Sequence, residues 1–298
     1  MSSQQRVSHN TVNQEQPKED ESVDYLENEY VTEEGSEINT RVNDDGVEEE
    51  QCPTCGNWYQ NIGQHWGYPT VDCGHPPISQ YKYELAIGFL MGDGNISKNS
   101  TNNNVLEITN TNKSMIDWIF QKFGWLSSSL QKRTSNYSAN CVNETNLGYE
   151  NYNAEAQDYF DTYTIKTRAH PVFNKLREWY KEDGLVFQEV EYTPTILRMW
   201  YISDGCNNLS NNDIQLTSCN ESERPSVIIQ CFNDVGIDIS NGNNHKHFRI
   251  GKDKDKFFDY IGHDPVPGFE YKWAQTKEEY ERLKKQCKSK HKTQTMED

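Results

Sequence analysis

Apolar residues are concentrated in two short runs, and each run predicts a buried helix. The first, from Tyr83 to Ile96, is too densely apolar for a surface helix with one buried face. The second, from Ile196 to Gly205, repeats the same design. Gly88 and Gly92 lie about one turn apart in the first run, where each costs roughly 1 kcal/mol against alanine but lets a second backbone approach closely. We therefore expect two helices that pack together, with the small Ser203 in the position of Gly92.

Each apolar run ends in the dipeptide Asp-Gly. Asp93 and Asp204 place a carboxylate against the negative end of a helix dipole, which costs a few tenths to about 1 kcal/mol unless a cation lies nearby. Gly94 suits the left-handed position that follows many helix ends. Asp-Gly is also a common turn dipeptide, but the two other Asp-Gly pairs of the chain do not end an apolar run. The repeated carboxylates therefore favour a functional interpretation over a turn.

The pattern after each run predicts the same order of elements. After the first helix we expect a strand, a helix, two strands and a helix, at Val105–Thr109, Lys113–Phe123, 127–142, Tyr159–Lys166 and Pro171–Tyr180. The second helix should begin at Thr193, a capping residue followed by proline. After it we expect a strand, a helix, two strands and a helix, at Ile214–Thr217, Arg224–Val235, Ile237–Ile239, His247–Ile250 and Lys254–Ile261. The fold class is α+β, with two pseudo-symmetric α-β-β-α-β-β-α halves.

Composition adds a tail to this picture. The formal net charge is −17, and residues 1–50 hold fifteen Asp and Glu against three Lys and Arg. Such a segment buries too little apolar surface to offset chain ordering, so we expect a disordered acidic tail. The rest of the 298-residue chain is only mildly acidic, which leaves room for nucleic-acid binding through a basic surface. Without a signal peptide or membrane span, we expect a soluble cytoplasmic protein with no membrane contact.

Eight cysteines in an intracellular protein favour metal ligands or free thiols over disulfides. Cys52, Cys55, His65 and Cys73 follow the spacing C-x2-C-x9-H-x7-C. This spacing fits a short knuckle, residues 51–77, that holds structural Zn²⁺ through thiolates and an imidazole. Unpaired thiols are the alternative. His75 stands before two prolines and is expected to be a linker residue rather than a ligand.

The two apolar runs carry a resemblance to a known family. L-A-I-G-F-L-M-G-D-G and L-R-M-W-Y-I-S-D-G resemble the two signature helices of single-chain LAGLIDADG homing endonucleases. Tyr163–Phe173 and Phe257–Trp273 resemble the stretches that close the two halves of such proteins. The resemblance covers roughly residues 78–275. The chain departs from the family pattern at Met199, where a glycine or another small residue is usual.

The resemblance implies a monomer whose halves, residues 78–182 and 183–275, form a saddle on double-stranded DNA. An antiparallel sheet from each half fits the major groove while helices cover its back. Candidate DNA contacts are strand residues that point away from the helices, namely Thr109, Arg133, Thr217 and Arg249; ordinary solvated strand faces are the alternative. The basic tail, residues 276–298, is either a phosphate-contacting extension or a solvated helix end.

Hydrolysis of a phosphodiester with water needs a divalent cation that polarises the phosphate and lowers the water pKa. Mg²⁺ prefers oxygen ligands, so Asp93 and Asp204 are the candidate metal ligands and catalytic residues, one for each DNA strand. The resemblance implies a staggered double-strand cut. It also places a basic catalytic residue at Lys166, with Lys252 as the nearest counterpart in the second half. Exposed lysines without a catalytic role are the alternative at both positions.

The leading hypothesis is therefore a Mg²⁺-dependent homing endonuclease with a long, asymmetric DNA target. A second hypothesis is a LAGLIDADG protein that has lost cutting and acts as an RNA-splicing maturase on intron RNA, or as a DNA-binding regulator. A structural or decoy remnant is the third. The presence of both aspartates favours the enzyme, whereas Met199 and the acidic tail leave the second hypothesis open.

Overall fold

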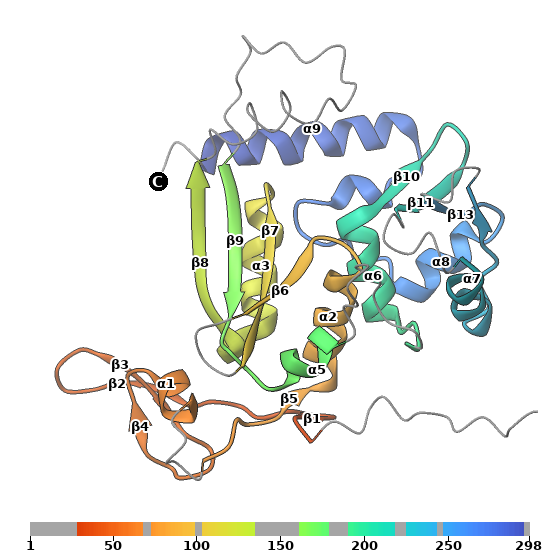
Figure 1. Ribbon diagram of the computed structural model, residues 1–298. Coiled ribbons are helices and arrows are strands. Elements are labelled where there is room, and N and C mark those ends of the chain that lie inside the picture. Colours follow the sequence, from red (N-terminus) through yellow and green to blue (C-terminus); the bar gives the residue numbers. More distant parts are fainter. Residues whose placement is uncertain are drawn as a thin grey trace, which may run out of the picture.

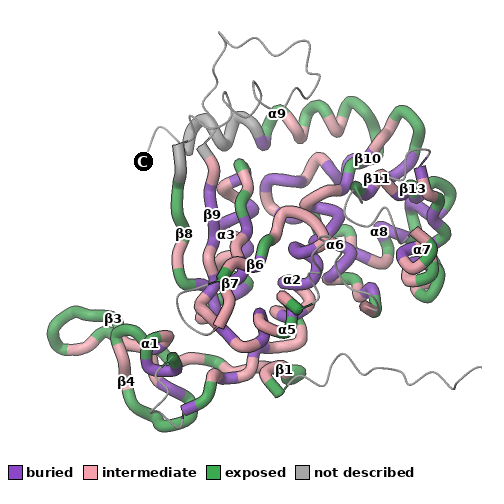
Figure 2. The backbone as a smooth tube through the Cα atoms, in the orientation of Figure 1, coloured by how far each residue is buried: buried purple, intermediate pink, exposed green. Residues whose placement is uncertain are grey.

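Two halves, each with a four-stranded antiparallel sheet, lie on either side of a central pair of helices (Figure 1). A small N-terminal module lies beside the first half (Figure 1). The computed structural model describes residues 29–67, 73–98, 103–134, 161–178, 190–217, 225–242 and 247–294. One cluster of buried apolar side chains extends through both halves, and it includes most of the central helices (Figure 2).

The first half follows the predicted order of helix, two strands, helix, two strands and helix. Its elements are α2 (Gln80–Leu90), β6 (Gly94–Lys98), β7 (Asn104–Asn110), α3 (Lys113–Phe123), the short 3-10 helix η1 (Gly124–Leu126), β8 (Ser127–Thr134), β9 (Asp161–Thr167) and α5 (Val172–Glu178). The strands pair in the order β6-β7-β9-β8. Apolar residues of β7 and β9 such as Leu106, Ile108 and Ile165 are buried in the core, so the alternate residues form an outer face away from it.

The second half repeats this order. Its elements are α6 (Pro194–Asp204), β10 (Gly205–Asn208), β11 (Asp213–Thr217), α7 (Pro225–Asp234), β12 (Ser240–Asn241), β13 (His247–Ile250) and α8 (Lys254–Ile261), followed by the 3-10 helix η3 (Glu270–Trp273) and α9 (Lys277–Gln294). The strands pair as β10-β11-β13-β12. The Thr193 hydroxyl accepts a hydrogen bond from the Ile196 amide and Pro194 opens the helix, which confirms the predicted start of α6.

One predicted strand is displaced. Ile237 and Ile239 are buried in the core, and β12 follows them at Ser240–Asn241. The Ile237 amide donates to the carbonyl of Phe232 at the end of α7. The apolar alternation at 237–239 therefore comes from packing behind a helix rather than from a strand of the sheet.

The central helices α2 and α6 approach each other closely because Gly88 and Gly92 lack side chains. A Cβ atom at Gly88 would lie 2.6 Å from Met199 Cβ and 2.7 Å from the Ile196 carbonyl oxygen. At Gly92 it would lie 2.3 Å from Ser203 Cβ. Met199, the departure from the family pattern, thus packs over a glycine of the partner helix and is fully buried.

We expect Gly88→Ala to lower the free energy of unfolding by about 1–3 kcal/mol. Alanine is intrinsically the better helix former by about 1 kcal/mol, so a loss of stability would come from the clash with Met199 and the α6 backbone. Urea unfolding measures the change. Gly67→Ala is the control, because a Cβ at that α1 residue meets no atom within 4 Å. Equal stability of the two variants would contradict the close approach.

The turns after the two helices differ from the prediction. The helix α2 ends at Leu90, with Asp93 in the following turn, whereas α6 continues to Asp204. Gly94 does not adopt a left-handed conformation. It is required because a Cβ there would lie 2.8 Å from the backbone of Phe89. Close packing of the chain over the helix end, and not a positive φ, explains the glycine.

The predicted disordered tail does not extend over residues 29–50. Residues 1–28 lie outside the described residues, but the segment from 29 to 51 contains β1 (Val31–Thr32), β2 (Thr40–Val42) and β3 (Glu48–Gln51). Strand β1 pairs in parallel with β5 (Ile78–Ser79), directly before α2. Backbone pairing with the rest of the protein orders this segment, which composition alone did not predict.

The N-terminal module is built around β2, β3, β4 (Trp58–Tyr59) and α1 (Ile62–Gly67). Its small core consists of Cys52, Ile62, Trp66 and Cys73. This module thus begins before the predicted knuckle boundary at residue 51. Among the described helices of the whole chain, none is both long and apolar enough to cross a membrane.

Candidate active site and metal centre

Asp93 and Asp204 come together where the two central helices end. A Cβ atom at Gly92 would lie 3.5 Å from Cγ of Asp204, so the turn that carries Asp93 abuts the second carboxylate. The charge of Asp204 also raises the pKa of Asp93, which requires that the two groups be near each other. The structure therefore brings together the two carboxylates that the sequence singled out.

Asp93 is held by a hydrogen bond and is largely withdrawn from water. Asn110 Nδ2 at the end of β7 donates to Asp93 Oδ2 at 2.8 Å. Burial raises the pKa of Asp93 to about 6, while the Asn110 hydrogen bond and the Lys272 ammonium oppose the shift. Burial also raises the pKa of Asp204, and Lys272 again opposes it. Both carboxylates are thus held in a site where their negative charge is costly without a cation.

Lys272 is the cation that acts on both carboxylates. Its side chain is buried at the end of α6, where Nζ donates to the carbonyl oxygens of Tyr201 at 3.0 Å, Ile202 at 2.7 Å and Gly205 at 2.8 Å. Burial lowers its pKa to about 8, and the charges of Asp93 and Asp204 are among those that oppose the shift. The ammonium therefore complements the negative end of the α6 dipole.

Sequence reasoning missed Lys272, although the residue lies in the quoted stretch Phe257–Trp273. A signal was present, because it is a lone lysine between aromatic residues in a segment expected to be buried. A buried lysine needs several acceptors or an anion. The helix end with its unpaired carbonyl groups is such a partner, but the sequence does not show that η3 packs against it.

The outer face of the first-half sheet carries a polar network. Lys166 Nζ pairs with Glu107 Oε1 at 2.7 Å, and Ser97 Oγ donates to the same oxygen at 2.7 Å. Thr109, a predicted DNA contact, exchanges a hydrogen bond with Thr164 at 2.8 Å on the same face. Lys166 therefore lies on the outer face of β9, near its end, as predicted.

The strand register identifies the second-half counterpart of Lys166. Gly94 of β6 pairs with Ile108 of β7, and Gly205 of β10 pairs with Leu216 of β11, so these residues correspond. One position before them, Glu107 pairs with Lys166, and Gln215 pairs with Arg249. Arg249 therefore occupies the place of Lys166.

This register does not support the predicted correspondence between Lys166 and Lys252. Lys252 follows β13, its side chain is 74% exposed, and its ammonium pairs with Asp238 at 2.6 Å. The sequence suggested Lys252 because it is the lysine nearest to the end of the corresponding strand. The hydrogen-bonded pairs give a different alignment, in which Arg249 takes that place.

The other predicted DNA contacts lie on the two sheets as well. Thr217 and Arg249 are exposed on the neighbouring strands β11 and β13. Arg249 Nε donates to His247 Nε2 at 3.1 Å. Arg133 belongs to β8, where it pairs with Thr162, but its side chain lies outside the described residues. The contacts predicted for the basic tail beyond residue 287 likewise concern side chains outside the described residues.

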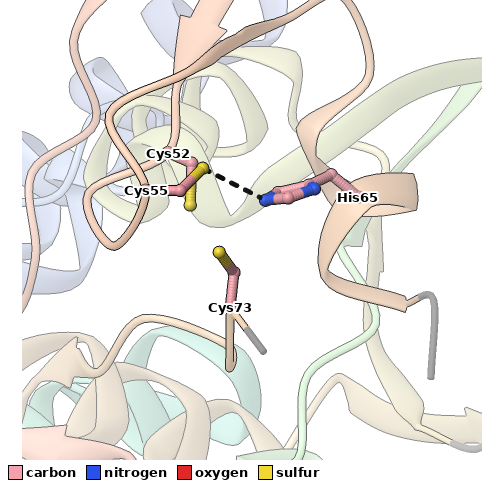
Figure 3. A group of neighbouring side chains, drawn as sticks. All are labelled: Cys52, Cys55, His65 and Cys73. Carbon is pink, nitrogen blue, oxygen red and sulfur yellow. Dashed lines mark hydrogen bonds between the residues drawn. The ribbon is translucent and has the colours of Figure 1, made fainter. Parts of the chain in front are cut away.

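The four predicted zinc ligands converge in the N-terminal module. One potential ligand atom from each of Cys52, Cys55, His65 and Cys73 lies within 4.8 Å of all the others. Figure 3 shows the three sulfur atoms and the imidazole gathered around one point, with Cys55 Sγ 3.7 Å from His65 Nε2. Three thiols and one imidazole at this spacing match a closed tetrahedral zinc site.

Neighbouring groups support the cluster. Trp66 Nε1 donates to Cys52 Sγ at 3.5 Å, and the Tyr59 ring stacks on the His65 ring at 3.9 Å. Hydrogen bonds from the Asn57 backbone and the Tyr59 hydroxyl lower the pKa of Cys55 to about 7. These contacts orient the ligands and favour the thiolate form of Cys55, whereas burial raises the pKa of Cys73 to about 11.

His75 does not take part in this cluster. Its ring lies 5.2 Å from that of His170, and Nε2 lies 3.3 Å from Asn103 Nδ2. Burial lowers its pKa. The residue therefore belongs to the linker that joins the module to the first half, in agreement with its predicted role.

Comparisons with known proteins identify a family and a shared fold. A model of the LAGLIDADG DNA endonuclease family matches residues 83–258. The homing endonuclease I-WcaI bound to its DNA recognition sequence is similar in structure, with a TM-score of 0.51 and 21% identity over 66% of this chain and 87% of that one. At that level of identity the likeness shows the shared fold.

Two further solved structures are more distant. I-DmoI in complex with DNA and Mn gives a TM-score of 0.37 and 12% identity over 62% of this chain and 98% of that one. Full-length DUF199/WhiA from Thermatoga maritima gives a TM-score of 0.38 and 12% identity over 70% of this chain and 62% of that one. Among curated proteins, none matches the sequence significantly.

Proposed function

This chain belongs to the LAGLIDADG DNA endonuclease family, and we propose from this premise that it is a metal-dependent enzyme that cuts both strands of a double-stranded DNA target. The observation that supports the proposal best is the pair of carboxylates at the adjoining ends of α2 and α6. Both have raised pKa values and both lie near one buried ammonium. An inactive remnant would have no need of this costly arrangement of charge.

Asp93 and Asp204 offer hard oxygen ligands, which fit Mg²⁺ or a similar divalent cation. When bound, the cation would supply Lewis-acid stabilisation of the phosphate and a more acidic water. Asn110 orients Asp93 by its hydrogen bond, and Lys272 moderates the repulsion between the carboxylates. Lys166 and Arg249, at matching places on the two sheets, are available to DNA phosphates or base edges.

Both halves of a LAGLIDADG site are present in one chain, so we propose that a single copy binds the DNA. The outer faces of the two sheets provide polar groups that differ between the halves, such as the Glu107–Lys166 pair in the first and Gln215 beside Arg249 in the second. Unequal groups on the two faces recognise unequal half-sites. We therefore propose that the target is asymmetric.

A selection from randomised DNA duplexes tests the function. The full chain is incubated with the library in Mg²⁺, and the cleaved ends are sequenced. We expect recurrent sequences with staggered ends and no cleavage in a chelator. Sequence-specific binding without cleavage would favour a DNA-binding regulator. Binding to structured intron RNA in preference to any duplex would favour a splicing maturase.

We also propose that Cys52, Cys55, His65 and Cys73 hold a structural Zn²⁺. The purified protein is then expected to contain about one Zn²⁺ per chain, and Cys52→Ser should lose it, because thiolate ligands and metal-dependent folding are coupled. Atomic emission measures the content. Cys231→Ser, at a cysteine of α7 outside the cluster, is the control and should retain the metal. Stoichiometric zinc in Cys52→Ser would contradict the site.

A further inference from the structure

The N-terminal module and the segments that join it to the first half contact three strands of the first half at one end of the sheet. Because β9 runs antiparallel to β7 and β8, its end lies beside the starts of those two strands. Asn103, directly before β7, contacts His75 at 3.3 Å. Trp125, shortly before β8, donates from Nε1 to the Ser36 carbonyl at 2.6 Å. Arg168, directly after β9, pairs through Nη2 with Glu50 Oε1 at 2.7 Å.

Residues beside the zinc cluster form these contacts. Trp66 follows the ligand His65, donates to the ligand Cys52, and packs edge-on against Trp125 at 5.5 Å. Gly63 lies in the same short helix, α1, and its open face lies against the Arg168 side chain. Among the described residues of the module, four side chains form its buried core, and two of them are predicted ligands. So small a core requires the metal to hold α1 and β3 in place.

Arg168 links the module to the first-half sheet. It comes two residues after Lys166, directly after the end of β9. The Arg168 amide donates to the Leu126 carbonyl at 2.7 Å, which fixes the corner between β9 and β8. Arg168 and Glu50 are both largely shielded from water, with side chains 20% and 18% exposed, so their ion pair is stronger than a surface pair.

The second half closes the matching edge with its own residues. Lys254 Nζ, at the start of α8, donates to Asn212 Oδ1 next to β11 at 3.3 Å. Asp253 Oδ2 accepts from the Asp238 amide at 2.8 Å. In the first half, Asn174 of α5 accepts a hydrogen bond from the Asn104 amide at 2.8 Å, and the N-terminal module adds the pair between Arg168 and Glu50. The two halves therefore differ in their dependence on that module.

We propose that zinc in the N-terminal module fixes the end of the first-half sheet where β9 ends and β7 and β8 begin. The zinc thereby controls DNA recognition by the first half and leaves recognition by the second half unchanged. This inference rests on the zinc site proposed above. Arg168 and Trp125 act as positioning residues, because they transmit the order of the module to strands that carry Lys166 and Thr109. The second half, which supplies Gln215 and Arg249, keeps its conformation when the zinc is removed.

Hydrogen exchange of the full chain tests the proposal without knowledge of the target. Zinc-loaded protein is compared with protein treated with a zinc-selective chelator, and the zinc content of each sample is measured. We expect amides of β7, β8 and β9 to exchange roughly tenfold faster without zinc, with β10, β11 and β13 unchanged. Equal exchange in the two zinc states, or equal acceleration in both halves, would overturn the inference.

A pair of glutamate variants separates the contact from the metal. Glu50→Gln removes the ion pair with Arg168 and leaves the ligands intact. Glu49→Gln is the matched control, since Glu49 lies on the same strand and pairs with Arg41 inside the module at 2.7 Å. We expect Glu50→Gln to keep its zinc, to exchange several-fold faster at β8 and β9, and to lose base discrimination in one half-site of the selected target. Glu49→Gln should also keep its zinc, but its exchange at β8 and β9 and its base discrimination should stay unchanged.

The outcomes distinguish this inference from the zinc proposal on which it rests. Protein without zinc in any preparation would refute the zinc site itself. Protein that binds zinc, but in which Glu50→Gln and Glu49→Gln behave alike, would refute the coupling between module and sheet. Loss of discrimination in both half-sites would refute its restriction to the first half.

Discussion

Asp93→Asn and Asp204→Asn are each expected to lower double-strand cleavage by on the order of 1,000-fold, because the metal they would bind supplies several kcal/mol of transition-state stabilisation. DNA affinity should change little, since it comes mostly from phosphate and groove contacts. A supercoiled plasmid that carries the selected target separates nicking from double-strand cutting. Asp117→Asn, a half-exposed carboxylate paired with Lys113 on α3, is the control.

The same Asp93 variant is expected to be more stable than the unmodified protein at pH 7 without divalent cations. The pKa of Asp93 is raised from 3.8 to about 6, so the folded protein holds a proton that the unfolded chain has lost between about pH 4 and 6. Stability therefore falls as the pH rises through that window, by on the order of 1–3 kcal/mol. Asn lacks this titration, and urea unfolding at pH 4, 5, 6 and 7 measures the difference.

A combined loss of activity and gain of stability excludes misfolding as the cause. Addition of Mg²⁺ should stabilise the unmodified protein more than the Asp93→Asn variant, because binding to the folded state raises the free energy of unfolding. If both aspartate variants cut the plasmid at the unmodified rate in Mg²⁺, the active site lies elsewhere on the molecule.

Lys272→Met is expected to reduce cleavage by about 100-fold or more and to lower the free energy of unfolding by roughly 2–4 kcal/mol. The change leaves three carbonyl groups at the end of α6 without their donor. It also removes the cation that lowers the pKa of Asp93 and of Asp204. The pKa of Asp93 should therefore rise above about 6, and the acid limb of the pH–rate profile should move to higher pH.

The parallel variant Lys252→Met tests the catalytic role that the sequence predicted for Lys252. Lys252 is exposed and its partner is Asp238, so the structure predicts a smaller loss of cleavage than for Lys272→Met. A larger loss of cleavage for Lys252→Met than for Lys272→Met, with an unchanged pH–rate profile for Lys272→Met, would favour the catalytic role that the sequence predicted for Lys252. Melting curves of both variants show whether each remains folded under the assay conditions.

Elements with strong periodicity could be predicted from sequence to the residue. Helix α3, strand β13 and helix α8 have the predicted bounds. The apolar positions of each segment face the core on one side, so its sequence pattern fits a single type of element. The two carboxylates could also be predicted, since an acid at the end of an apolar helix is costly and therefore informative. Likewise, the four cysteine and histidine ligands follow a spacing that chemistry constrains closely.

Features that depend on contacts between distant segments could not be predicted. The role of Lys272 depends on the packing of η3 against α6, some 70 residues earlier in the chain. The match between Lys166 and Arg249 depends on the hydrogen-bonded register of the strands, which the sequence does not show. The sequence suggested Lys252, three residues after Arg249. Strands β1 to β3 are short and lie in an acidic segment, and their pairing with later segments orders them.

The unequal helix pair at the centre of the protein limits how its halves can be recombined. Gly88 of α2 corresponds to Met199 of α6, and the Met199 side chain fills the space that Gly88 leaves open. A homodimer of two second halves would bring two methionines into one space, and a homodimer of two first halves would leave a cavity. Chimaeras with related enzymes should therefore exchange Gly88 and Met199 as a unit, whichever half is replaced.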